Sequence, residues 1–296
     1  PVVIAGHGIR LAKANDIFLK MIAKLKIPVV SSNMIVDLMD YNDPYYLGVV
    51  GMKGHRAANI AIQNCDLLIS IGCRLSVQLI GFEYEKFSPN SKKIVVDIDA
   101  NEHSKKTINI DLLIESDAKL FIKGLMQNVK NCKFYFDRNW GRNLKSLVYK
   151  YPVFLPEYVK IKGPCDMYYA INEISENCRE HDIIISDAGF PYYMVGQAMK
   201  IKIGQRLILP GGTAPLGYNL PASIGAAIAG KNRKIICITG DGSLQTNIHE
   251  LGTIVVNKLP VKIFVLNNDG YLSIRITQKN YCEGRYIGES KETGLG

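Results

Sequence analysis

The residues best suited to chemistry are a carboxylate between two glycines and a polar turn 27 residues further along. The carboxylate is Asp241 in the run Gly240-Asp241-Gly242-Ser243, which directly follows apolar residues. Glycines let a bulky anion approach the backbone, and free amides there can hold phosphate oxygens. A helix is expected next, so its positive amino end would also face the anion. We therefore expect an anion site at the end of a buried strand, the edge at which open α/β sheets bind ligands.

The polar turn is Asn267-Asn268-Asp269-Gly270, and it also follows an apolar run. Consecutive βα units usually place such strand ends close together. A carboxylate oxygen, an amide oxygen and a backbone carbonyl, completed by phosphate oxygens and water, would form the oxygen site that Mg²⁺ prefers. Each motif alone has the composition of a tight turn. The pair, separated by a strand, loop and helix pattern, predicts a joint metal and diphosphate site.

These two motifs, with the small-residue stretch at 212–222, resemble the fingerprint of thiamine-diphosphate enzymes, in which GDG is followed at a similar distance by NN. The resemblance implies that Asp241, Asn268 and the carbonyl of Gly270 hold the metal. It also implies that Leu216 props the cofactor into a bent shape, although an ordinary core leucine is the alternative. The candidate cofactor-binding residues are Gly189, Leu216, Gly217, Gly240, Asp241, Gly242, Ser243, Asn268, Gly270 and Tyr271, and the metal ligands are Asp241, Asn268 and Gly270.

The first half of the chain resembles the middle domain of acetolactate synthases, on the segments 47–55, 58–59, 65–74 and 94–99. That domain holds FAD in the synthases and is empty in many relatives, so both states are open here. Gly6-His7-Gly8 lacks the third glycine of a dinucleotide motif, and Leu75-Ser76-Val77 replaces the Phe-Asp-Asp of FAD-binding members. The candidate FAD contacts are Gly6, Gly8, Gly51, Gly54, Gly72, Arg74 and Asp99.

Alternating strand-like and helix-like runs predict an α/β fold with two doubly wound parallel-sheet domains. We expect a Rossmann-like domain at 1–128, a connection at 129–162 without a clear period, and a diphosphate-binding domain at 163–296. The predicted strands are 2–5, 27–30, 66–71, 93–98, 182–186, 234–239 and 261–266. The predicted helices are 12–25, 57–64, 165–178, 221–229 and 247–256.

Composition excludes several other classes of protein. No apolar run is long enough to span a bilayer, so we expect no membrane partner. The net charge is +9, but the basic residues are spread over both halves without a nucleic-acid motif, so no nucleic-acid partner is expected. The seven cysteines form no CxxC pair, which is typical of reduced thiols in a cytoplasmic protein.

The resemblance implies a decarboxylating carboligase that acts on a 2-keto acid such as pyruvate and assembles as a homodimer or homotetramer. In the family, the activating glutamate comes from an amino-terminal domain. Because the chain starts in a strand and ends in a loop, we expect a fragment without that domain, which alone binds the cofactor weakly and turns over nothing. Glu250 and His249 are interpreted as structural.

Departures from the family pattern leave the second substrate open. Ile274 stands where simple decarboxylases carry Glu, Thr277 where synthases carry an acceptor-selecting Trp, and Phe190-Pro191 where they carry Gln-His. Two alternatives from other classes remain. One is a non-catalytic nucleotide- or cofactor-binding module that keeps the fold, and the other is an NAD-dependent oxidoreductase based on Gly6-His7-Gly8.

Overall fold

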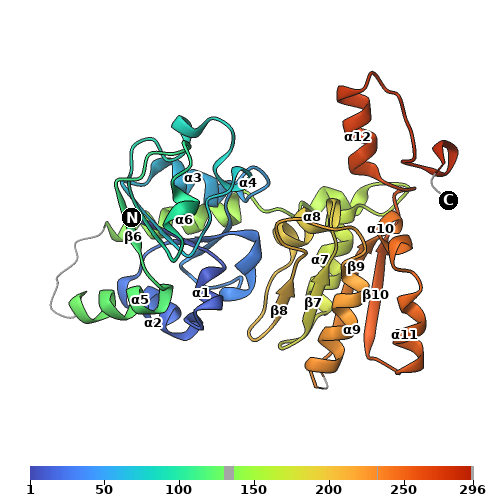
Figure 1. The fold of residues 1–296 in the computed structure, drawn as a ribbon, viewed down its shortest axis with the longest axis horizontal. Coiled ribbons are helices and arrows are strands. Elements are labelled where there is room, and N and C mark those ends of the chain that lie inside the picture. The colour runs from blue at the N-terminus through green and yellow to red at the C-terminus, as the bar shows by residue number, and fades with distance from the viewer. Residues whose placement is uncertain (130–136, 232, 295–296) are drawn as a thin grey trace. The chain divides into compact units, whose positions relative to one another are not determined.

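The computed structural model describes residues 1–129, 137–231 and 233–294. The chain divides into two compact units, Pro1–Leu155 and Pro156–Gly296 (Figure 1). Each unit is built on a parallel sheet with interleaved helices, so the predicted α/β class is confirmed.

The first unit contains a six-stranded sheet in the order β3-β2-β1-β4-β5-β6, parallel throughout. Its strands are β1 Val2–Ala5, β2 Val29–Ser31, β3 Tyr46–Val49, β4 Leu67–Ile71, β5 Lys92–Asp97 and β6 Leu112–Glu115. The strand order reverses between β1 and β4, where Ala5 pairs with Ile71. Ligands of doubly wound sheets bind outside the strand ends at such a reversal.

Helices cover both faces of this sheet, because successive side chains of the central strand point to opposite sides. Val3 and Ala5 pack with α2 and α5, whereas Val2 and Ile4 pack with α3 and α6. The helices are α1 Gly8–Leu11, α2 Asn15–Leu25, α3 Arg56–Asn64, α4 Val77–Ile80, α5 Ala118–Asn128 and α6 Arg138–Lys150. Short 3₁₀ turns lie at η1 Asn33–Leu38, η2 Tyr84–Lys86 and η3 Ala100–His103.

The second unit contains a four-stranded parallel sheet in the order β10-β9-β7-β8. Its strands are β7 Ile183–Ser186, β8 Arg206–Ile208, β9 Ile235–Gly240 and β10 Val261–Leu266. Its helices are α7 Met167–Asn177, α8 Phe190–Ala198, α9 Asn219–Ala229, α10 Asp241–Thr246, α11 Glu250–Val256 and α12 Leu272–Tyr281, with 3₁₀ turns η5 Pro156–Lys160 and η6 Lys291–Thr293. Ile183, Ile185 and Ile235 pack against alanines of α9, so small residues let this helix lie close to the sheet.

Two helix predictions need correction. The helix predicted at 12–25 is broken at Lys13, whose φ of +52° separates α1 from α2. The helix predicted at 247–256 starts at Glu250, and a separate helix, α10, already begins at Asp241.

The connection predicted at 129–162 was expected to lack a clear period, and this expectation is wrong over α6. Trp140, Leu144, Leu147 and Val148 form a helical stripe that packs into the first unit. Residues 130–136 of that connection lie outside the described residues.

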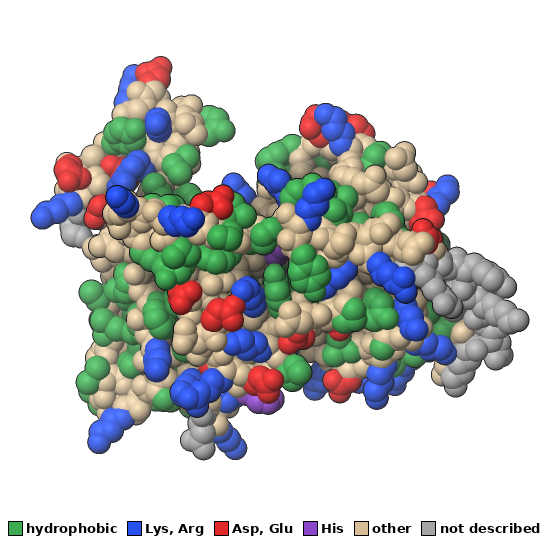
Figure 2. Space-filling view, turned by 180° about the vertical axis from the view of Figure 1, so that it is seen from behind, with side chains coloured by type: hydrophobic (Ala, Val, Ile, Leu, Met, Phe, Trp, Pro, Cys, Tyr) green, Lys and Arg blue, Asp and Glu red, His purple; other side chains and the backbone are tan. Residues whose placement is uncertain are grey.

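The basic side chains on the face drawn in Figure 2 lie scattered among acidic and apolar ones. Six cysteines are described and all are free, while Cys132 lies outside the described residues. None of the described helices combines the length and apolar character that a bilayer crossing requires.

Candidate functional site

The register of the second sheet brings the two predicted motifs together. β9 ends at Gly240, and the chain turns directly into α10 at Asp241. β10 pairs with β9 up to Leu266 opposite Gly240. The turn that follows β10 therefore emerges beside Asp241 at the carboxyl edge of the sheet.

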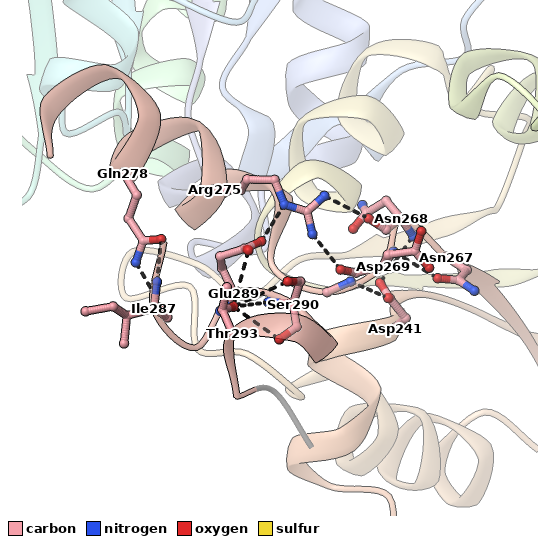
Figure 3. A network of polar contacts seen from close by, with 11 residues as sticks. Asp241, Asn267, Asn268, Asp269, Arg275, Gln278, Ile287, Glu289, Ser290 and Thr293 are labelled. Carbon is pink, nitrogen blue, oxygen red and sulfur yellow. Dashed lines mark hydrogen bonds and ion pairs between the residues drawn. The ribbon is translucent and has the colours of Figure 1, made fainter. Parts of the chain in front are cut away.

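Two backbone hydrogen bonds join the Asp241 carboxylate to this turn (Figure 3). Oδ2 accepts the amide of Gly270 at 2.7 Å, and Oδ1 accepts the amide of Asn268 at 3.4 Å. The turn curls because Asp269 and Gly270 both have positive φ, of 60° and 114°. Aspartate and glycine tolerate this left-handed region better than most residues do.

The side-chain oxygen Oδ1 of Asn268 is buried without a hydrogen-bond partner among the described residues. Buried polar atoms are nearly always paired, and an unpaired one costs about 1–3 kcal/mol. An amide oxygen next to a carboxylate suits a hard cation such as Mg²⁺. In the described ranges no group of three or more His, Cys, Asp or Glu side chains could hold a metal. A cation at Asp241 and Asn268 would therefore need further oxygens from its ligand.

The two glycines beside Asp241 have different roles. A Cβ at Gly242 would lie 2.6 Å from the Tyr271 ring, and the Tyr271 hydroxyl donates to the carbonyl of Gly242 at 3.2 Å. A Cβ at Gly240 would meet nothing within 4 Å. Packing thus requires glycine at 242, whereas Gly240 borders open space that a ligand can approach. Ser243 follows in α10 and is buried.

The loop that contains Leu216 and Gly217 packs against the end of α10. Gly217 has φ +76°, and a Cβ there would lie 1.9 Å from Oγ1 of Thr246. Its carbonyl accepts a hydrogen bond from Asn247 Nδ2 at 3.0 Å. Leu216 is 38% exposed, so it is not a buried core leucine. An apolar side chain is therefore left accessible in this loop.

Two other positions considered from the sequence make their described contacts with residues outside the Asp241 turn. Gly189, with φ +73°, caps the amino end of α8, and its added Cβ would lie 3.6 Å from Ser273 of α12. Glu250 is the first residue of α11 rather than a mid-helix residue, and its Oε1 lies 3.7 Å from Nε2 of the exposed His249. No described contact joins either residue to Asp241.

Sequence reasoning did not select Asp187, which is fully buried at the end of β7. Its carboxylate accepts the Ala188 amide at 2.8 Å and the Thr239 hydroxyl at 3.1 Å. The backbone of Gly217 and the side chain of Ser243 also donate to it. Burial raises the pKa of Asp187, and these donors oppose the rise. The signal that could have found Asp187 is its position directly after a run of isoleucines, like that of Asp241.

In the first unit, the candidate FAD contacts are already engaged within the protein. Each of the five glycine amides donates internally: Gly6 to Ile71, Gly8 to Gly72, Gly51 to Asn59, Gly54 to Gly51, and Gly72 to Val96. A Cβ at Gly6 would lie 2.0 Å from the Gly72 carbonyl, so these glycines serve close backbone packing. Arg74 pairs with Glu102 at 2.9 Å, and Asp99 caps η3. These groups do not fit a pyrophosphate held by backbone amides.

Comparison with known proteins connects both units to described families. Residues 1–125 match the family "Thiamine pyrophosphate enzyme, central domain", and residues 187–295 match "Thiamine pyrophosphate enzyme, C-terminal TPP binding domain". The candidate residues Gly189 to Tyr271 all fall in the second match.

The chain is also similar to acetolactate synthase large subunits. It is 34% identical to that of Cyanidium caldarium, over 99% of this chain and 50% of the relative. It is 34% identical to a probable large subunit of Methanococcus aeolicus (90% and 46%) and 28% identical to the isozyme 2 large subunit of Escherichia coli K12 (97% and 50%). The chain thus spans about half the length of these curated relatives.

Proposed function

Since the chain belongs to the thiamine pyrophosphate enzymes, we propose that it supplies the cofactor-binding part of an acetolactate synthase-like carboligase. Its substrate class is a 2-keto acid such as pyruvate, and its cofactors are thiamine diphosphate and Mg²⁺. We further propose that it works as a homodimer or homotetramer. The observation that carries the proposal is the Asp241 carboxylate bonded to the Asn268–Gly270 turn, beside the unpaired Asn268 oxygen.

The residues at the strand ends fit the diphosphate and its cation. Asp241, Asn268 and the Gly270 carbonyl would hold Mg²⁺, which needs the additional oxygens that a diphosphate brings. The open space at Gly240 would admit the phosphates, and Ser243 would support them. Leu216, accessible in its loop, would support the bent shape of the cofactor.

When bound, thiamine diphosphate supplies a nucleophilic carbon and an electron sink for the decarboxylation of a 2-keto acid. The chain's own part is to hold the diphosphate in place and to exclude water around the reactive ring of the cofactor. We propose that the activating carboxylate comes from a further domain, because Glu250 begins α11 and makes no described contact with Asp241 or its turn.

The second substrate is proposed to differ from a second pyruvate. Ile274 and Thr277 on α12 replace the Glu of simple decarboxylases and the Trp that selects the acceptor in synthases. Both side chains are exposed, and neither is as large as the tryptophan that selects the acceptor in synthases. An aldehyde carried on a larger polar group would fit a less occluded approach. Product analysis with pyruvate and a panel of aldehydes distinguishes these acceptors.

The direct test is calorimetric titration of the chain with thiamine diphosphate in the presence of Mg²⁺. Wild-type protein is expected to bind in a Mg²⁺-dependent manner, and Asp241→Ala to lose at least tenfold in affinity, as expected for removing a charged ligand. The matched control is Asp269→Asn, which alters an exposed carboxylate of the adjoining turn and should bind like the wild type. Equal binding by wild type and Asp241→Ala would remove the basis of the proposal. If the cofactor binds but no turnover is seen when an activating domain is supplied, the alternative of a non-catalytic binding module would be favoured instead.

A further inference from the structure

Arg275 of α12 contacts the turn that faces Asp241 (Figure 3). Its Nη2 donates to the carbonyl of Asp269 at 2.6 Å, and its Nη1 lies 3.5 Å from the carbonyl of Asn268. The Asp269 carbonyl belongs to the same peptide unit as the Gly270 amide, which donates to Asp241. One guanidinium thus holds the outer, carbonyl side of the turn while the carboxylate holds its amide side.

Glu289 is the counter-ion of this guanidinium. Its carboxylate pairs with Nε of Arg275, and its side chain is 4% exposed. The Glu289 backbone carbonyl accepts the Tyr271 amide at 2.7 Å, so this residue contacts both the ion pair and the end of the turn. The pairing neutralises the guanidinium, so Arg275 adds little net positive charge beside a cation site.

The segment after α12 is fastened so that Glu289 is held in place. Gln278 of α12 bonds both backbone groups of Ile287, at 3.0 and 3.2 Å. Ser290 and Thr293 form a capping box around η6, and the Thr293 hydroxyl also donates to Glu289. This arrangement forms a clip, residues 282–294, that carries the counter-ion of Arg275.

We propose that Arg275 is a positioning residue for the metal and diphosphate site, acting with Glu289 to fix the Asn268–Gly270 turn against Asp241. The identity of the ligand at this site rests on the function proposed above, whereas the contacts that Arg275 makes with the turn do not. The turn needs such support because Asp269 has a left-handed backbone, which costs free energy unless its surroundings stabilise it. A guanidinium suits this task, since its rigid fork can hold two carbonyls and a carboxylate together.

The first test needs no cofactor. Hydrogen exchange is measured on the whole chain for wild type, Arg275→Met and the control Arg285→Met, which removes an exposed arginine of the same clip. The amides of Asn268, Gly270 and Tyr271 should exchange about tenfold faster in Arg275→Met, as the loss of a charged hydrogen bond implies. The amides of β9 should be unchanged in both variants. Equal exchange of the turn in wild type and Arg275→Met would overturn the proposal.

The second test uses free Mn²⁺, detected by electron paramagnetic resonance, with thiamine diphosphate as its ligand. Arg275→Met should weaken Mn²⁺ binding about tenfold, Arg275→Lys should recover part of it, and Arg285→Met should leave it unchanged. Glu289→Gln leaves the guanidinium charge uncompensated, so its loss of affinity should shrink as ionic strength rises. Full affinity in Arg275→Met would contradict a positioning role, whereas a part of the Glu289→Gln loss that persists at high ionic strength would support one, because salt screens charge repulsion but does not restore geometry.

The two proposals fail in different ways. If wild type takes up no Mn²⁺ with thiamine diphosphate, the proposed function fails, while the exchange experiment still decides whether Arg275 holds the turn. If wild type binds and Asp241→Ala does not, but Arg275→Met matches wild type in both measurements, only the role of Arg275 is lost.

Discussion

Gly270 donates its amide to the Asp241 carboxylate at 2.7 Å, which joins the residue after one strand to the turn after its neighbour. The parallel pairing of β9 with β10 makes this contact possible, because both strands end at the same level. The carboxylate is thereby oriented before any ligand arrives. Preorganisation of this kind lowers the ordering cost of binding.

Asn268→Ala is expected to have opposite effects on the ligand-free and the ligand-bound protein. Without ligand, the change removes a buried oxygen that has no partner among the described residues, so stability should be unchanged or raised by about 1 kcal/mol. With Mg²⁺ and thiamine diphosphate, the stabilisation seen in wild type should be lost. Thermal unfolding with and without both ligands measures the two effects.

The control for this prediction is Asn267→Ala, one residue earlier. Asn267 is exposed and its side chain caps the Asp269 amide at 3.0 Å, so its loss should weaken the turn slightly but retain the ligand-induced shift. A full ligand-induced shift in Asn268→Ala would show that the buried oxygen does not bind the cation.

Gly217→Ala should lower the free energy of unfolding of the second unit by ~2 kcal/mol. The residue has φ +76°, and the added methyl would meet Thr246 at 1.9 Å. Gly212→Ala, in the same stretch, has open space around its Cβ and should be nearly neutral. Chemical denaturation of both variants measures the difference, and similar stabilities would indicate that the loop relaxes without strain.

The strands could be predicted where the sequence carries a largely apolar run, both for the buried central strand β1 and for the edge strand β10. β1 and β10 begin and end at the predicted residues, and β9 differs by one residue at each end. β3, β6 and β8 were missed, because each has only three or four residues and lies at the edge of its sheet. α6 was missed because its apolar stripe is mixed with asparagines, lysines and aromatic residues of the exposed face.

The proximity of Asp241 to the Asn268 turn could also be predicted, since neighbouring parallel strands end at one edge of a sheet. The contacts that support that turn could not be predicted. Arg275 contacts the turn from α12, and residues 282–294 fold back to place Glu289 against the same guanidinium. Such a tertiary arrangement leaves no periodic signal in the sequence.

Asp187→Asn should change how stability depends on pH. Burial raises the pKa of Asp187, so the protonated carboxyl is favoured by folding, and its stabilising contribution is lost as pH rises through the folded pKa. Asparagine does not titrate. The free energy of unfolding of the variant minus that of wild type should therefore begin to increase near the ordinary aspartate pKa of about 3.9 as pH rises, and should level off above the folded pKa. Calorimetry across this range tests the prediction, and a constant or falling difference would contradict it.

The first unit is expected to bind no FAD. The amides of Gly6, Gly8 and Gly72 lie where the strand order reverses, the place at which a dinucleotide phosphate would bind, and each donates to a backbone carbonyl of the chain. Binding there would require breaking these bonds and separating Gly6 from Gly72. Purified protein should therefore show no flavin absorption, and titration with FAD should leave flavin fluorescence unquenched. The titration is needed because a weakly held flavin can be lost during purification, whereas quenching at a one-to-one ratio would show that the site opens for it.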